Sequence, residues 1–176
     1  MANYYIYLIA SLPMLQLNSR PPFLYQAFLE KCKGLIPEDE FLLFEKIPKI
    51  IEHGMIESQP TLKKYLEFEF ALRNELAKLR SARKNDDLLK YLREAQTADP
   101  YIAHIALNAY RNPSIVEAEK ILDQGRWVKL SELEIGHFFD IDFLAAYAFK
   151  LLILERWEEI RVCDKEALFE GVLANN

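Results

Sequence analysis

The sequence contains few of the residues that support turn-rich or disulfide-linked folds. It has five glycines and two cysteines among 176 residues. A low glycine content disfavours a β-sandwich with many tight turns. Cys32 and Cys163 lie far apart and have no Cys-x-x-Cys spacing. We therefore expect no structural disulfide, and we interpret both thiols as reduced core residues of a cytoplasmic protein.

Motifs that carry chemistry are missing as well. The chain has no G-x-x-x-x-G-K-[ST] and no G-x-G-x-x-G pattern, so we expect no bound ATP or dinucleotide. The histidines His53, His104 and His137 have no second histidine or cysteine at the spacing of a common metal motif. His104 lies in a predicted helix among apolar residues, which is typical of a structural histidine. We expect no metal, no cofactor and no catalytic residue.

Long apolar runs are also absent. The N-terminal segment MANYYIYLIASLP lacks the basic residues and the small-residue cleavage site of a signal peptide, and it is too short to span a bilayer. The apolar stretch Phe143 to Leu154 is equally short and contains Lys150. We expect a cytoplasmic protein whose link to a membrane, if it has one, runs through a partner.

The charge balance is acidic, with 27 Asp and Glu against 22 Lys and Arg. A net charge of −5 disfavours nucleic-acid binding, because phosphate contacts need clustered Lys and Arg. Residues 60–93 nevertheless hold nine basic and five acidic side chains, whereas residues 94–176 hold eight basic and fifteen acidic ones. Either the basic segment packs beside the acidic C-terminal half, which is the simpler interpretation, or each meets a different partner.

What the sequence does contain is a helical pattern. In the run Leu62 to Arg93, apolar residues recur at steps of three or four, and charged pairs such as Glu69 with Arg73 are placed on the opposite face. The pattern predicts a mainly α protein, one compact domain over residues 1–176 with about seven or eight helices. Tyr4 to Ala10, rich in aromatic and β-branched residues, favours a short strand, and a buried helix stays open there.

Prolines and capping residues predict the helix boundaries. Pro37, Pro60 and Asp99 with Pro100 are each expected to open a helix. Asn112 with Pro113 would open another, which Gly125 would close. The remaining predicted features are an interruption of the long run at Asn85 to Asp87, a brief helix capped by Ser131 with Glu134, an apolar helix from Phe143 to Glu159 capped by Asp140 or Asp142, and a last helix from Asp164 to Val172.

Four side chains are candidate contacts to a protein partner. Arg73, Arg80 and Arg83 are spaced so that they share a broad helix face, where guanidinium groups can bind carboxylates through two hydrogen bonds. Trp127 follows Arg126, and Trp and Arg are enriched in the centres of protein interfaces. A solvated helix face is the alternative explanation for the three arginines.

Three segments carry a family resemblance. They are the N-terminal NYYIYLIASLP, the sequence LRNEL at residues 72–76 with Arg80 and Arg83 behind it, and Leu151 to Trp157. Together they resemble a family of small bacterial proteins whose genes lie among those of V-type (A/V-type) ATPase subunits. The alternation of Leu and Arg is also similar, more loosely, to the helical repeats of the C/d subunit of V-type ATPases. That subunit seats the central stalk on the membrane rotor, and this chain is shorter and lacks a clear threefold repeat.

The resemblance implies a non-enzymatic subunit or an accessory or assembly factor of a bacterial V-type ATPase, with stalk or rotor subunits as its partners. It implies a fold similar to part of the C/d subunit and a cytoplasmic location, peripheral to the inner membrane through the ATPase. Two alternatives stay open. One is a helical adaptor or regulator unrelated to the ATPase. The other is a small hydrolase or transferase that uses His104 with an acidic residue of the C-terminal half.

Overall fold

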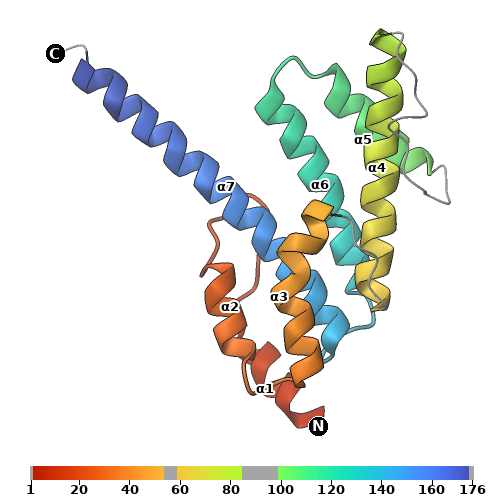
Figure 1. Ribbon diagram of the computed structural model, residues 1–176, viewed down its shortest axis with the longest axis vertical. Coiled ribbons are helices and arrows are strands. Elements are labelled where there is room, and N and C mark those ends of the chain that lie inside the picture. Colours follow the sequence, from red (N-terminus) through yellow and green to blue (C-terminus); the bar gives the residue numbers. More distant parts are fainter. Residues whose placement is uncertain (1, 54–58, 85–98, 175–176) are drawn as a thin grey trace. The chain divides into compact units, whose positions relative to one another are not determined.

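The chain is mainly α-helical (Figure 1). The computed structural model describes residues 2–53, 59–84 and 99–174, and it describes side chains over 5–50, 59–82 and 99–163. Over these residues it contains seven helices and no strand, which confirms the predicted fold class. The helices are α1 (Ala2–Ser11), α2 (Tyr25–Cys32), α3 (Glu38–His53), α4 (Pro60–Lys84), α5 (Pro100–Arg111), α6 (Ile115–Leu133) and α7 (Ile141–Ala174).

The residues group into two compact units. The first contains residues 1–48 and 137–176, and the second contains residues 49–136. Helix α3 contributes its first part to one unit and its last part to the other. The expectation of one domain over the whole chain stays a prediction.

The predicted N-terminal strand is wrong, because these residues form helix α1. Tyr5, Leu8 and Ile9 are buried, whereas Ile6 and Tyr7 are exposed. Burial at steps of three and four places one face of a helix against the core, a pattern that a strand cannot produce. Composition favoured a strand here, and packing of one helical face outweighs that weak local preference.

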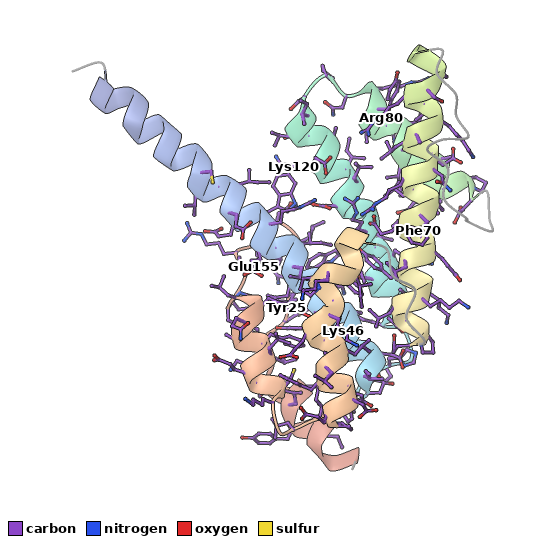
Figure 2. All side chains as sticks on the ribbon, viewed as in Figure 1. Tyr25, Lys46, Phe70, Arg80, Lys120 and Glu155 are labelled. Carbon is purple, nitrogen blue, oxygen red and sulfur yellow. The ribbon has the colours of Figure 1, made fainter. Side chains whose placement is uncertain are left out.

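The core of the first unit is aromatic. Phe28 of α2 lies edge-on to Phe44 of α3, with ring centroids 5.8 Å apart, and stacks on Tyr147 of α7 at 5.7 Å. The loop between α1 and α2 is fixed to α7, because the Tyr147 hydroxyl donates to the Pro13 carbonyl at 3.0 Å and Arg161 donates to the Ser19 carbonyl at 3.0 Å. Figure 2 shows Tyr25 and Glu155 where α2 meets α7, and the Tyr25 backbone N–H donates to the Glu155 carboxylate at 3.3 Å.

Helix α3 contains an internal proline, Pro48. Proline has no N–H, so it cannot donate to the carbonyl four residues earlier, which belongs to Phe44. The hydroxyl of Tyr25 donates to that carbonyl instead, at 2.8 Å in a buried position. Burial, together with the nearby Cys32 and Glu155, raises the pKa of Tyr25 well above its usual value. A side chain of α2 thus replaces the helix hydrogen bond that Pro48 removes.

The second unit packs α5 against both α4 and α6. The predicted apolar stripe of α4 is confirmed, since Leu62, Tyr65, Phe68, Leu72 and Leu76 are buried and Leu79 is half-buried.

Gly125 does not end a helix, as the sequence suggested, but lies inside α6. A Cβ atom at Gly125 would come within 2.7 Å of the Ile105 Cδ1 atom, so the missing side chain permits close packing of α5 on α6.

Several predicted boundaries are confirmed. Helices α3, α4 and α5 begin next to Pro37, at Pro60 and at Pro100. The Asp99 side chain accepts a hydrogen bond from the Tyr101 N–H at 2.8 Å, and Asp140 caps α7 by accepting from the Phe143 N–H at 3.0 Å.

Other boundaries differ from the prediction. The cap of α6 is Ser114, whose hydroxyl accepts from the Glu117 N–H, whereas Asn112 ends α5. Ser131 lies inside α6 and donates to the Trp127 carbonyl, so no separate helix begins there. The last two predicted helices are one continuous helix, α7. The predicted interruption at residues 85–87 lies outside the described residues.

Of the helices described, none is both long and apolar enough to cross a membrane.

Candidate functional site

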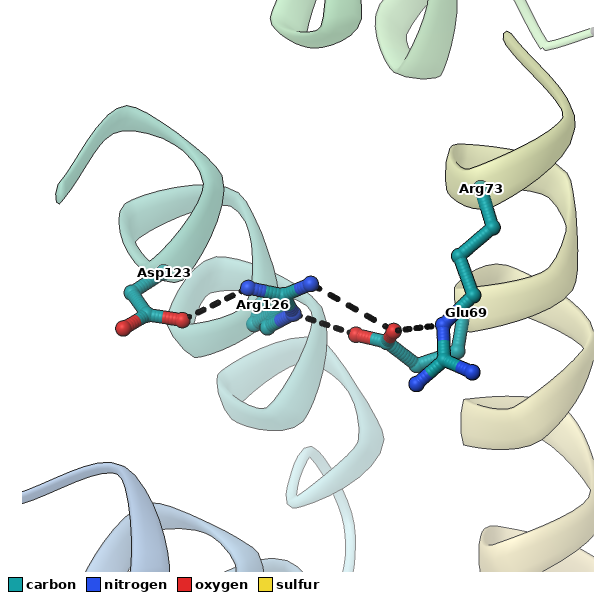
Figure 3. Close-up of polar contacts among 4 residues, drawn as sticks. All are labelled: Glu69, Arg73, Asp123 and Arg126. Atoms are coloured by element: carbon teal, nitrogen blue, oxygen red, sulfur yellow. Dashed lines mark hydrogen bonds and ion pairs between the residues drawn. The ribbon is translucent and has the colours of Figure 1, made fainter. Parts of the chain in front are cut away.

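A polar cluster of the second unit joins α4 to α6 (Figure 3). Arg126 of α6 donates its Nε–H and one Nη–H to the two carboxylate oxygens of Glu69 on α4, the second contact measuring 3.5 Å. Its other Nη group donates to the Asp123 carboxylate at 2.8 Å. Arg73 adds an ion pair to Glu69 at 3.4 Å. Two arginines and two carboxylates therefore form one connected network.

This network is largely removed from solvent. The side chains of Glu69, Asp123 and Arg126 are 5%, 1% and 15% exposed. Burial by itself lowers the pKa of Arg126, but the attraction and hydrogen bond of Glu69, with smaller contributions from Tyr65 and Asp123, raise it above its usual value. The guanidinium is thus permanently charged, and together with Arg73 it balances the charge of the two carboxylates. These paired and buried charges link α4 to α6.

The predicted contact residues have different surroundings. Arg73 is half-buried and pairs with Glu69, so it belongs to the internal network. Arg80, labelled near the end of α4 in Figure 2, is exposed, and within the described residues its guanidinium has no hydrogen bond or ion pair. Trp127 is half-buried on α6. Arg83 belongs to α4, but its side chain lies outside the described residues.

Helix α4 also exposes other basic residues. Lys63 and Lys64 are exposed near its start. Lys78 is exposed in its second half, where its Nζ atom pairs with the Glu75 carboxylate at 2.6 Å. Glu67 is the exposed carboxylate of this surface. The solvent side of α4 therefore carries a net positive charge, whereas Glu69 is directed inward to Arg126. We call the exposed Lys63, Lys64, Lys78 and Arg80 the basic residues of α4; Arg80 lies on a different side of the helix from Lys64 and Lys78.

A second polar group lies in the first unit, directly before α7. Donor atoms of His137, Asp140 and Asp142 all lie within 4.8 Å of one another. The His137 Nδ1 atom is 2.7 Å from an Asp140 oxygen and 3.7 Å from an Asp142 oxygen. Among the residues described, this is the group of three or more whose donor atoms could surround a metal ion. We call it the His137 cluster.

The histidine considered for catalysis and the two cysteines have different surroundings. His104 is exposed on α5, although its sequence neighbours are apolar, and its Nε2 atom lies 2.9 Å from the Asn108 amide nitrogen. Cys32 is buried, as predicted, and burial raises its pKa to about 12, which leaves almost no thiolate at neutral pH. Cys163 is exposed, so its assignment to the core was wrong.

Sequence patterns missed the most important contacts. Glu69 and Arg126 are separated by 57 residues, and no local spacing relates them. The sequence placed Glu69 on a solvated face with Arg73, and only its burial against α6 changes that interpretation. The His137 cluster was visible in principle as His-x-x-Asp-x-Asp, but this spacing belongs to no common metal motif, and Asp140 and Asp142 were assigned as caps.

A comparison of the chain with protein-family models, with curated proteins and with solved structures gave no significant match. The fold and the clusters define a class of protein. The chain is a mainly α, multi-helix protein with a buried ion network in its second unit.

Proposed function

We propose that this protein is a non-enzymatic docking component of a bacterial V-type ATPase, either a subunit or an accessory or assembly factor. The choice of partner rests on the resemblance of the segments around Asn3 to Pro13, Leu72 to Arg83 and Leu151 to Trp157. The observation that carries the docking role is the set of exposed basic residues of α4, among which Arg80 makes no ion pair within the described residues.

The partner surface that fits the basic residues of α4 is acidic. Lys63, Lys64 and Arg80 present positive charge, and a guanidinium binds a carboxylate through two parallel hydrogen bonds. The same helix is fixed on its inner side by Glu69 and Arg126, so its exposed side chains project from a rigid support. Rigid presentation reduces the conformational entropy that is lost on binding. Docking of this kind would keep ATPase subunits in register during assembly or rotation.

The proposal is tested by purifying the tagged protein from its native host at moderate salt and identifying what remains bound by mass spectrometry. We expect stoichiometric recovery of ATPase stalk or rotor subunits. Arg80→Glu should reduce that recovery at least tenfold, because it places a carboxylate against an acidic surface.

Lys46→Glu is the matched control, since it reverses the charge of an exposed lysine on α3, outside the basic residues of α4. Equal losses in both variants would indicate a diffuse electrostatic effect and contradict a contact at Arg80. An eluate without ATPase subunits, from cells shown to express the ATPase, would refute the ATPase as partner. A different stoichiometric partner that Arg80→Glu releases would instead favour the unrelated helical adaptor.

A further inference from the structure

We infer that the His137 cluster is a binding site for a divalent transition-metal ion, with His137, Asp140 and Asp142 as its protein ligands. The inference is independent of the docking role, because it rests on a different unit and on different side chains. It also differs from the expectation of no metal, which considered only the spacings of common motifs.

The geometry supplies three donors of two kinds. One imidazole nitrogen and two carboxylate oxygens lie within 4.8 Å of one another, and the His137 Nδ1 atom lies 2.7 and 3.7 Å from the two oxygens. Ligands of a tetrahedral zinc ion at about 2.0 Å are separated by roughly 3.3 Å, so small side-chain movements bring these atoms into place. All three side chains are half-buried, which leaves the remaining coordination positions to water.

The charge of the cluster favours a divalent cation over a simple ion pair. One carboxylate is sufficient to neutralise a protonated His137, and Asp140 already lies at hydrogen-bonding distance. Asp142 adds a second negative charge 3.7 Å from the same nitrogen. Both carboxylates therefore place negative charge beside the imidazole nitrogen, which attracts a divalent cation.

The orientation of Asp140 is fixed from outside the cluster. Its Oδ1 atom accepts the hydrogen bond from the Phe143 N–H that caps α7, which directs its Oδ2 atom toward His137. Such supporting hydrogen bonds are typical of carboxylate ligands. The imidazole donor selects among metals, because Zn²⁺, Cu²⁺ and Ni²⁺ accept imidazole nitrogen, whereas Mg²⁺, Ca²⁺ and Mn²⁺ prefer oxygen ligands.

The test is titration of the metal-free, full-length protein with Zn²⁺ at neutral pH by isothermal calorimetry. We expect one saturable site and a thermal midpoint that rises with Zn²⁺, since binding to the folded state alone stabilises it. His137→Ala and Asp140→Asn should each weaken the affinity at least tenfold. Asn also caps helices well, so the second variant removes a ligand charge while preserving the start of α7.

Two control variants separate this cluster from other zinc ligands. His104→Ala removes an exposed imidazole and Cys163→Ser removes an exposed thiol, and neither should change the affinity. The inference is overturned if Zn²⁺ shows no saturable binding, if His137→Ala binds as tightly as the native chain, or if the control variants lose the site. Binding of Mg²⁺ in preference to Zn²⁺ would overturn the assignment to a transition metal.

Discussion

Arginines that look equivalent in the sequence have distinct roles at the level of single residues. Arg73 and Arg126 are held by Glu69, whereas Arg80 faces solvent. The difference arises from which carboxylates the fold brings near each guanidinium. Removing one partner of a buried ion pair leaves an uncompensated charge, which is far more costly than losing an exposed pair. The network therefore matters for the stability of the second unit, and Arg80 matters for what the unit contacts.

Arg126→Met should destabilise the protein by about 3–5 kcal/mol, because it leaves Glu69 and Asp123 buried with fewer partners. Urea unfolding followed by circular dichroism measures this. Adding Glu69→Leu to Arg126→Met should recover part of the loss, since an apolar pair does not need neutralising.

The exposed pair on the same helix, Lys120 with Glu117, provides the control for that experiment. Lys120→Met should change the free energy of unfolding by less than about 1 kcal/mol. If Arg126→Met is no more harmful than Lys120→Met, the network is not a stabilising feature.

At the level of elements, α3 depends on a side chain from another helix. Pro48 removes one helix hydrogen bond, and the Tyr25 hydroxyl replaces it at the Phe44 carbonyl. The hydroxyl is buried, so its removal leaves a carbonyl without a partner rather than one that water can reach. A weakness in one helix is thus corrected by the packing of α2 against it.

Tyr25→Phe should destabilise the protein by about 1–3 kcal/mol, the usual cost of an unsatisfied buried polar group. Pro48→Ala restores an N–H that can donate to Phe44, so Tyr25→Phe should cost less in that background. A double-mutant cycle, measured by chemical unfolding, gives the coupling energy directly. A cost of Tyr25→Phe that is the same with and without Pro48 would contradict this account.

Local signals predicted the element starts well and the contacts between elements poorly. Asp99 was identified as a cap, and Asp140 as one of two candidates, because a cap is decided by residues two or three positions away. Gly125 was misassigned because its role depends on Ile105, a residue of a different helix. Glu69 was misplaced for the same reason, since α6 decides which side of it is buried. Most of the fold was therefore accessible from the sequence, whereas the network and the His137 cluster required the packed structure.

At the level of the whole molecule, the question is whether the two units unfold together. Helix α3 contributes to both, because Phe44 and Ile47 belong to one unit and Ile50 to the other, and all three side chains are buried. Helix formation is cooperative, so loss of one end of α3 destabilises its other end. The chain also supplies one tryptophan for each unit, Trp157 in the first and Trp127 in the second.

Single-tryptophan variants make this measurable. Trp127→Phe leaves a fluorophore in the first unit, and Trp157→Phe leaves one in the second. We expect the fluorescence midpoint of each variant to coincide with its own circular dichroism midpoint, as cooperative unfolding requires. Fluorescence and circular dichroism midpoints that separate within a variant would show that the units unfold independently and would refute the single-domain prediction.

The contact between Tyr25 and the carbonyl before Pro48 also constrains how this sequence can change over generations. A hydroxyl at position 25 is needed only while position 48 is proline. A lineage that first replaces Pro48 is then free to lose the hydroxyl, whereas the reverse order passes through a less stable intermediate. The two positions should therefore vary together among descendants of this chain, although 23 residues separate them in the sequence.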